Sequence, residues 1–411
     1  MRVAFFTETF LPKVDGIVTT LCQTARQLVR LGHEVLIIAP EGGPGEFEQC
    51  RVFGVPGHPF PFYPELSLSF PRASIHRVLE EFQPDLIHAL EPVCLGIAAL
   101  HSSGGRDGGR MRVPLVVSYH TDLPKYLGYF RLRFLEPFIW PLLRLRHNRA
   151  TVNLCTSTAI VQELEEHGIE RVALWPGGVD MERFHPKRRS AAMRARLAAG
   201  HPESPLLLYT GRLSTEKGIE RLTSILDAVP EARLALVGDG PHRPALERHF
   251  AGLPVFMAGF LHGDELAEAF ASADIFVMPS ETETLGLVVL EAMASGLPVV
   301  GACAGGIPDM IEDGVNGFLF DTEARAAAMV ARLVANGTER EAFGRAARAT
   351  ALNRSWEAAT LSLVEHYRTA CAIQHIAPVG LPVPQLPATL SFRARNALGA
   401  ATSFAFRKLL P

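Results

Sequence analysis

The chain has 411 residues, and 40 Lys and Arg side chains stand against 43 Asp and Glu. This length exceeds what one hydrophobic core usually serves, and 48% of the residues are hydrophobic, so we expect two packed domains. The near-neutral charge excludes a nucleic-acid partner that binds through bulk positive charge. The Cys residues lack CxxC or metal-ligand spacing, which is typical of free thiols in a reducing cytosol.

The N-terminal half alternates predicted strands and helices. A strand over residues 3–6 is followed by a loop, a helix over about 17–31 and a strand over 35–39. Because this strand comes so early, we expect no signal peptide. Further strands are predicted at 85–89, 115–119, 152–155 and 172–175. Repeated strand–helix–strand units predict an α/β domain with a parallel sheet, which we assign to residues 1–176.

The second half repeats the pattern, and we assign it to a domain over residues 177–355. Its predicted strands lie at 206–210, 233–237, 255–257, 275–278 and 299–300. Each runs into a loop with Gly or Pro, and α/β folds bind ligands at such strand ends. A final helix is predicted at 356–372, and a Pro-rich linker and tail fill residues 373–411.

Two segments combine basic and bulky apolar residues. Residues 130–149 hold five Arg against one Glu, and residues 389–411 hold four basic residues and no acidic one. Such segments can lie on an anionic membrane surface. The alternative for each is packing against the protein itself with a solvated basic face, and the sequence leaves both open. No uninterrupted apolar run reaches the roughly 18 residues of a membrane-spanning helix.

Two carboxylates mark the stretch between the strand that ends at Met278 and the strand that begins near Val299. Glu283 and Glu291 are eight positions apart, and a helix is expected to open near Gly286. If Glu283 precedes the helix and Glu291 lies about two turns inside it, both side chains can face one cleft. The helix start offers unpaired N–H groups that suit a phosphate. Hydroxyl-binding carboxylates beside an anion site fit a nucleotide-sugar.

Two cations follow the predicted strand over 206–210. Arg212 and Lys217 are five positions apart on the loop at its end and could reach one pyrophosphate. In the first domain, Gly16 at a helix start would let an anion approach the N–H groups. His120 ends the strand over 115–119 and would point towards the same space if the two sheets face each other.

Together these motifs resemble those of glycosyltransferase family 4, retaining enzymes of GT-B fold, over nearly all of residues 1–372. The stretch Pro279–Met293 is most similar to the sulfoquinovosyltransferases, or sulfolipid synthases. So are the segments Ser118–Thr121, Gly238–Pro241 and Gly263–Leu266. The resemblance implies two Rossmann-like domains that face each other across a cleft, with the last helix crossing back to the first domain. It also implies transfer of sulfoquinovose from UDP-sulfoquinovose to diacylglycerol with retention.

The resemblance also implies roles for the candidate residues. Arg212 and Lys217 would hold the pyrophosphate and stabilise the departing UDP, and Gly16 would let the phosphate approach. Glu291 would hold the ribose, and Glu283 and His120 would lie at the sugar. The remaining donor-binding candidates are the helix-start residues Gly286, Leu287 and Val288.

No metal or other cofactor is expected, because Arg and Lys would neutralise the leaving group. A sulfonate needs a cation or several donors, and Lys125, Arg131 and Arg133 are the candidates. We expect a cytoplasmic enzyme that lies peripherally on the inner face of the membrane. The alternatives are a GDP-mannose- or UDP-glucose-dependent α-glycosyltransferase on a lipid or soluble acceptor, or a sugar-nucleotide binder or epimerase without transfer activity.

Overall fold

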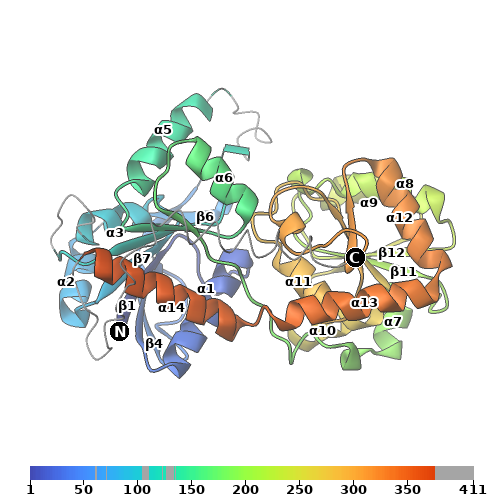
Figure 1. The fold of residues 1–411 in the computed structure, drawn as a ribbon, viewed down its shortest axis with the longest axis horizontal. Helices are drawn as coiled ribbons and strands as arrows, with labels where there is room; N and C mark the ends of the chain where they lie inside the picture. Colours follow the sequence, from blue (N-terminus) through green and yellow to red (C-terminus); the bar gives the residue numbers. More distant parts are fainter. Residues whose placement is uncertain are drawn as a thin grey trace, which may run out of the picture.

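The computed structural model describes residues 1–60, 63–70, 72–103, 111–122, 124–125, 134 and 136–374. Within them the chain forms two β-sheets, each covered by helices and each belonging to one half of the sequence (Figure 1). A short antiparallel hairpin of β5 (Gly57–Phe60) and β6 (Tyr63–Ser69) stands apart from both sheets. The predicted α/β class is confirmed.

The N-terminal sheet has eight strands in the order β10-β9-β8-β7-β1-β2-β4-β3, and every pair is parallel except β3 with β4. Its strands are β1 (Arg2–Thr7), β2 (Glu34–Pro40), β3 (Glu46–Phe47), β4 (Cys50–Val55), β7 (Leu86–Leu90), β8 (Leu115–Tyr119), β9 (Val152–Cys155) and β10 (Val172–Leu174). Its helices are α1 (Gly16–Arg30), α2 (Ala73–Phe82), α3 (Leu95–Ser103), α5 (Glu136–His147) and α6 (Thr158–Glu166).

The C-terminal sheet has six parallel strands in the order β13-β12-β11-β14-β15-β16. They are β11 (Leu206–Thr210), β12 (Arg233–Val237), β13 (Val255–Gly259), β14 (Ile275–Met278), β15 (Val299–Ala302) and β16 (Gly317–Phe320). The helices are α7 (Ala191–Leu197), α8 (Thr223–Ala228), α9 (Arg243–His249), α10 (Gly263–Ser272), α11 (Leu287–Ala294), α12 (Glu323–Ala335) and α13 (Gly337–Leu352). Helices on both faces bury the central strands, which explains why those strands read as continuous apolar runs.

The last helix, α14 (Trp356–Ile373), leaves the C-terminal half and packs on the N-terminal sheet beside α1 (Figure 1). Its buried residues Leu363, Val364 and Tyr367 belong to the same hydrophobic core as Phe5 of β1. Apolar burial of this kind is the main force that holds the helix in place. The chain therefore passes between its two halves twice.

The two passages lie side by side. Val179 forms a parallel bridge with Ser355, and its N–H donates to the carbonyl of Arg354. A Cβ on Gly178 would lie 2.6 Å from the backbone of Trp356, so only glycine fits where the two passages meet. Among the described helices, none is both long and apolar enough to cross a bilayer.

Candidate functional site

The loop after β11 is held by glycines in neighbouring loops. A Cβ on Gly238 would lie 1.9 Å from the carbonyl oxygen of Gly211, and one on Gly240 would lie 2.3 Å from that of Leu213. Gly211 and Gly238 both have a positive φ, which glycine adopts without strain. The ends of β11 and β12 therefore pack backbone against backbone. This packing fixes the segment that carries Arg212.

Lys217 and Glu283 form an ion pair. The Lys217 Nζ lies 2.5 Å from the Glu283 Oε1, and each side chain is 14% exposed. Lys217 ends a short 3₁₀ turn after β11, and Glu283 lies on the loop after β14, the strand next to β11. Adjacent parallel strands thus bring together two candidates that are far apart in the sequence.

The guanidinium of Arg212 interacts electrostatically with Asp15, which lies in the N-terminal half of the chain. Burial lowers the pKa of its guanidinium, and the carboxylates of Glu216 and Asp15 oppose that effect. Asp15 is the N-cap of α1, and its Oδ1 accepts a hydrogen bond from the N–H of Val18 at 2.9 Å. A Cβ on Gly16 would lie 4.0 Å from the Cδ1 of Leu287. The starts of α1 and α11 therefore lie close to one another across the two halves.

Helix α11 (Leu287–Ala294) opens at Gly286 as predicted, but Glu291 lies less deep in it than expected. Gly286 is its N-cap with φ 74°, and Leu287 is its first residue. Glu291 consequently lies about one turn inside the helix rather than two, because Thr284–Gly286 belong to the loop. Burial raises the pKa of Glu291 to about 7, and the nearby charge of Arg183 opposes the rise. The two carboxylates have different surroundings, one paired with Lys217 and one half-buried in the helix.

The loop that carries Glu283 touches the N-terminal half directly. The Thr284 Oγ1 donates to the carbonyl of His120 at 2.6 Å, and the Thr156 Oγ1 donates to the carbonyl of Thr284 at 2.8 Å. His120 is buried, which lowers its pKa to about 4, although Asp15 opposes this shift. His120 is therefore hydrogen-bonded to Thr284, the residue that follows Glu283 in the sequence.

The glycine pair after β15 serves this same loop. The N–H of Gly306 donates to the carbonyl of Glu283 at 2.7 Å, and a Cβ on Gly305 would lie 2.2 Å from that oxygen. A pair of glycines at a strand end can let the backbone approach a ligand closely. In the structure they approach the backbone of residues 283–284 instead, and so hold the site loop rather than line the site.

Of the three sulfonate candidates, Lys125 lies within the described residues, and it is paired with two carboxylates. Lys125 lies 2.6 Å from Asp122 and 3.2 Å from Glu163. Burial lowers the pKa of Lys125, but hydrogen bonds and charge from both carboxylates outweigh it, so the pKa is raised. Arg131 and Arg133 lie outside the described residues.

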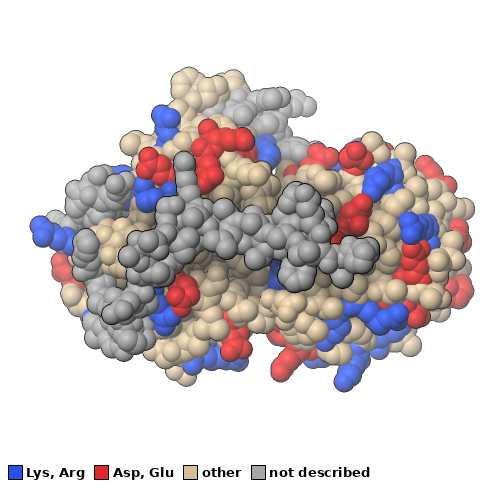
Figure 2. All heavy atoms as spheres, in the orientation of Figure 1, with Lys and Arg blue, Asp and Glu red and all other residues tan. Residues whose placement is uncertain are grey.

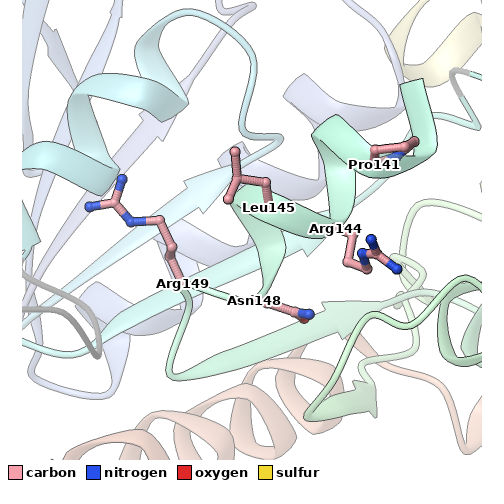
Figure 3. Close-up of a pocket in the computed structure, with 5 residues that line it drawn as sticks. All are labelled: Pro141, Arg144, Leu145, Asn148 and Arg149. Atoms are coloured by element: carbon pink, nitrogen blue, oxygen red, sulfur yellow. The ribbon is translucent and has the colours of Figure 1, made fainter. Parts of the chain in front are cut away.

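Helix α5 carries most of the described part of the basic segment 130–149. It presents Phe138, Leu142 and Leu145 to solvent at the spacing of one helical face, while Leu143 and His147 on the opposite face are buried. A pocket of about 480 Å³ lies on this helix, lined by Pro141, Arg144, Leu145, Asn148 and Arg149 (Figure 3). The segment 389–411 lies outside the described residues.

Two buried carboxyl groups were not predicted from the sequence. Glu8 follows β1, Glu91 follows β7, and burial raises the pKa of each to about 7. The Glu8 Oε1 accepts from the N–H of Gly96 at the start of α3, so it caps that helix. Neither residue has a motif that marks it in the sequence. No group of three or more His, Cys, Asp or Glu side chains suited to a metal occurs within the described part of the chain.

Comparison with known proteins finds one family model for each half of the chain. The family model for Glycosyltransferase Family 4 matches residues 14–183, and that for Glycosyl transferases group 1 matches residues 204–336. The chain is 42% identical to the sulfoquinovosyl transferase SQD2 of Arabidopsis thaliana, over 88% of this chain and 72% of the relative. It is 38% identical to a GDP-mannose-dependent alpha-mannosyltransferase of Mycobacterium tuberculosis, over 89% of this chain and 96% of the relative.

The fold has a counterpart among solved structures. Anabaena Alr3699/HepE, crystallised in complex with UDP-glucose, superposes with a TM-score of 0.71 at 21% identity and covers 89% of this chain and 99% of its own. That likeness identifies the architecture as GT-B, as the two facing α/β halves indicate. With the family models and the identities above, it leads to one conclusion. The chain belongs to glycosyltransferase family 4 and is a hexosyltransferase of GT-B fold.

Proposed function

We propose that this enzyme transfers sulfoquinovose from UDP-sulfoquinovose to diacylglycerol with retention of the anomeric configuration. The similarity to the sulfoquinovosyl transferase SQD2, over 88% of this chain, supports the choice of sugar. The stretch Pro279–Met293, which resembles sulfolipid synthases, supports it as well. The observation that carries the assignment of the site is the contact of Lys217 with Glu283 beside the start of α11.

The leaving UDP requires stabilisation of negative charge on its pyrophosphate. Lys217 and Arg212 sit on one loop after β11, and the helix starts at Gly16 and Leu287 add N–H groups near them. We assign the pyrophosphate to this space. Positioned cations act on charge that grows as the bond to the sugar breaks, and such electrostatic stabilisation usually contributes most to the rate acceleration.

The carboxylates divide the rest of the donor between them. Glu291 would accept hydrogen bonds from the ribose hydroxyls, and Glu283 would contact the sugar. Because Glu283 is paired with Lys217, it is a poor nucleophile, which is consistent with front-face retention without a protein nucleophile. His120, joined to this loop through Thr284, would lie at the sugar.

The lipid acceptor is proposed to reach the site from a membrane surface on which α5 lies. The exposed stripe of Phe138, Leu142 and Leu145 is apolar, and Arg144 lies beside it. Apolar side chains flanked by Arg suit the boundary of an anionic bilayer. We accordingly place the enzyme peripherally on the cytoplasmic face of the membrane, with residues 389–411 as a second contact.

A second candidate donor is GDP-mannose. The mannosyltransferase of Mycobacterium tuberculosis matches this chain over 96% of its own length, against 72% for SQD2. Lys125, one of three cations considered for the sulfonate, is engaged by Asp122 and Glu163. Sulfoquinovose recognition is therefore proposed to depend on Arg131 or Arg133.

Thermal unfolding with UDP or GDP distinguishes the two donors. A ligand that binds only the native state raises the Tm, by an amount that grows with its concentration over its Kd. We expect UDP to raise the Tm and GDP, at equal concentration, to leave it unchanged. A larger rise with GDP would favour the mannosyltransferase, and no rise with either would contradict the assignment of the cleft.

A further inference from the structure

A chain of hydrogen bonds joins His120 to the crossing helix. The His120 Nε2 lies 2.9 Å from the Ser118 Oγ, which lies 3.0 Å from the His88 Nε2. The His88 Nδ1 lies 2.7 Å from the hydroxyl of Tyr367 on α14. The chain runs from the site through two adjacent strands, β8 and β7, to a helix that arrives from the other half of the molecule.

The four side chains share one face of the N-terminal sheet. Ser118 and His120 alternate with Tyr119 along β8 and its end, so both point to the side that α14 covers. Ser118, His88 and Tyr367 are each fully buried, and His120 nearly so. The ring of Trp175 contacts both imidazoles, with centroids 5.8 Å from each. Fixed rings in a buried chain leave few alternatives for where each proton lies.

The hydroxyl of Ser118 has one hydrogen, so it donates to one imidazole and accepts from the other. Burial lowers the pKa of His88 well below its ordinary value and that of His120 to about 4, so both rings are neutral near pH 7. Each neutral ring carries one N–H. The hydrogen bonds between Tyr367, His88, Ser118 and His120 can therefore all run in one direction or all in the other. The two arrangements place each shared proton on a different atom.

The hydroxyl of Tyr367 determines which of these two hydrogen-bond arrangements forms. Among the described residues, the hydroxyl of Tyr367 has a single hydrogen-bond partner, the His88 Nδ1. If His88 donated to Tyr367, the buried phenol hydrogen would have no acceptor, which is costly. Tyr367 therefore donates to His88, His88 donates from Nε2 to Ser118, and Ser118 donates to the Nε2 of His120.

We propose that Tyr367, His88 and Ser118 are positioning residues that hold His120 with its proton on Nδ1. His120 then presents an N–H donor to an oxygen of the donor sugar, and it cannot accept a proton from the acceptor at that nitrogen. This inference rests on the proposed function for the place of the sugar. It also makes the seating of α14 a condition for the correct form of His120.

The tautomer of His120 can be measured without any substrate. Protein labelled with ¹⁵N-histidine reports in two-bond ¹⁵N–¹H spectra which ring nitrogen carries the proton, and His120→Gln assigns the signal. We expect the Nδ1–H form in the wild type and a shift towards the Nε2–H form in Tyr367→Phe. An Nε2–H form in the wild type, or an unchanged form in Tyr367→Phe, would overturn the proposal even if no sugar is ever transferred.

Turnover provides the second readout. Tyr367→Phe keeps the buried ring and removes one hydroxyl, so kcat should fall about 10-fold, the equivalent of one hydrogen bond, with little change in the donor KM. The matched control is Thr360→Val, which removes another buried hydroxyl from α14, one that donates to the carbonyl of Trp356. An equal loss of kcat in both variants would overturn the relay. Ser118→Ala, which breaks the chain next to His120, should reproduce the Tyr367→Phe spectrum.

Discussion

Lys217 and Glu283 lie at the centre of the proposed donor site and also depend on one another for stability. Each side chain is 14% exposed, so removal of either partner leaves a largely desolvated charge. A buried charge without a partner is costly, which keeps both side chains in place before a ligand arrives. Because the two side chains follow β11 and β14, the pairing of these strands keeps the proposed donor site in place.

Replacement of Lys217 by Met tests this residue. The variant keeps the aliphatic stem and removes the charge from the proposed pyrophosphate site, so kcat/KM should fall by about 100–1000-fold. The unpaired Glu283 should lower the free energy of unfolding by about 1–3 kcal/mol. Steady-state kinetics and urea unfolding measure the two effects. Lys187→Met is the matched control, because Lys187 is exposed in the same half of the chain; normal kcat/KM in Lys217→Met would remove Lys217 from the site.

Glu291 gives a prediction about pH. Its pKa is about 7 in the folded protein, against an ordinary value of 4.5, so the folded state holds this proton more tightly than the unfolded chain does. The resulting stabilisation is complete below about pH 4.5 and is lost as pH rises through 7. Relative to Glu291→Gln, the wild type should lose about 2–3 kcal/mol of unfolding free energy between pH 5 and pH 8.

Urea unfolding of both proteins at pH 5, 6.5 and 8 measures that difference. Glu8 and Glu91 titrate in the same range but are common to both proteins, so their contribution cancels. A difference that stays constant across the three values would mean that Glu291 is ionised throughout.

The candidate residues could be chosen from the sequence, but their contacts could not. Arg212, Lys217 and Glu283 stand at the ends of apolar runs, which marks them as strand-end residues. The contact of Lys217 with Glu283 depends on β11 lying next to β14, an adjacency that no local pattern encodes. Tyr367 was missed because a tyrosine in a helix has an ordinary structural explanation.

At the scale of elements, the passage between the two halves relies on glycine. A Cβ on Gly178 would lie 2.6 Å from the backbone of Trp356, the first residue of α14. Gly178→Ala must therefore displace the start of α14, and we expect a loss of about 1–3 kcal/mol in unfolding free energy. Gly45→Ala is the control, since a Cβ there meets no atom within 4 Å. Equal free energies of unfolding for the two variants in urea would show that the start of α14 can be displaced at little energetic cost.

The exposed face of α5 predicts membrane binding. Phe138→Ser with Leu145→Ser removes side chains that are 72% and 66% exposed, so the fold should be unaffected. Sedimentation with phosphatidylglycerol vesicles should show binding weakened about 10-fold or more, because each apolar side chain contributes roughly 1.5–3 kcal/mol when buried. The matched control is Leu352→Ser with Leu361→Ser, two exposed leucines on α13 and α14. Equal vesicle binding by both double variants would leave α5 as a solvent-exposed helix.

Elements with long apolar runs were predicted within a residue or two. The strands β8, β9, β11, β12 and β14 have the predicted bounds, because buried parallel strands are continuous apolar runs. The strand β4 was missed since its neighbour on one side is the two-residue strand β3, and four of its six residues are not buried. The strand β16 was missed because it is only four residues long and begins with Gly317.

At the scale of the whole molecule, the repeated strand–helix order predicts two α/β units, and the structure confirms two sheets. We propose that the domain boundary lies at residues 176–177, between the last strand of one sheet and the first of the other, with α14 joining the N-terminal unit. On the face in Figure 2, acidic and basic side chains are interspersed, which agrees with the near-neutral composition. The closeness of Gly16 to Leu287 could not be predicted, because it depends on how the two units face each other.

The most direct measurement is product formation by the full chain. The purified protein is incubated with diacylglycerol in anionic vesicles and with UDP-sulfoquinovose, UDP-glucose or GDP-mannose, and the lipids are analysed by mass spectrometry. The proposed function predicts sulfoquinovosyldiacylglycerol from UDP-sulfoquinovose, with the other donors turned over at least about 100-fold more slowly. Mannosylated product from GDP-mannose, without transfer from UDP-sulfoquinovose, would contradict it.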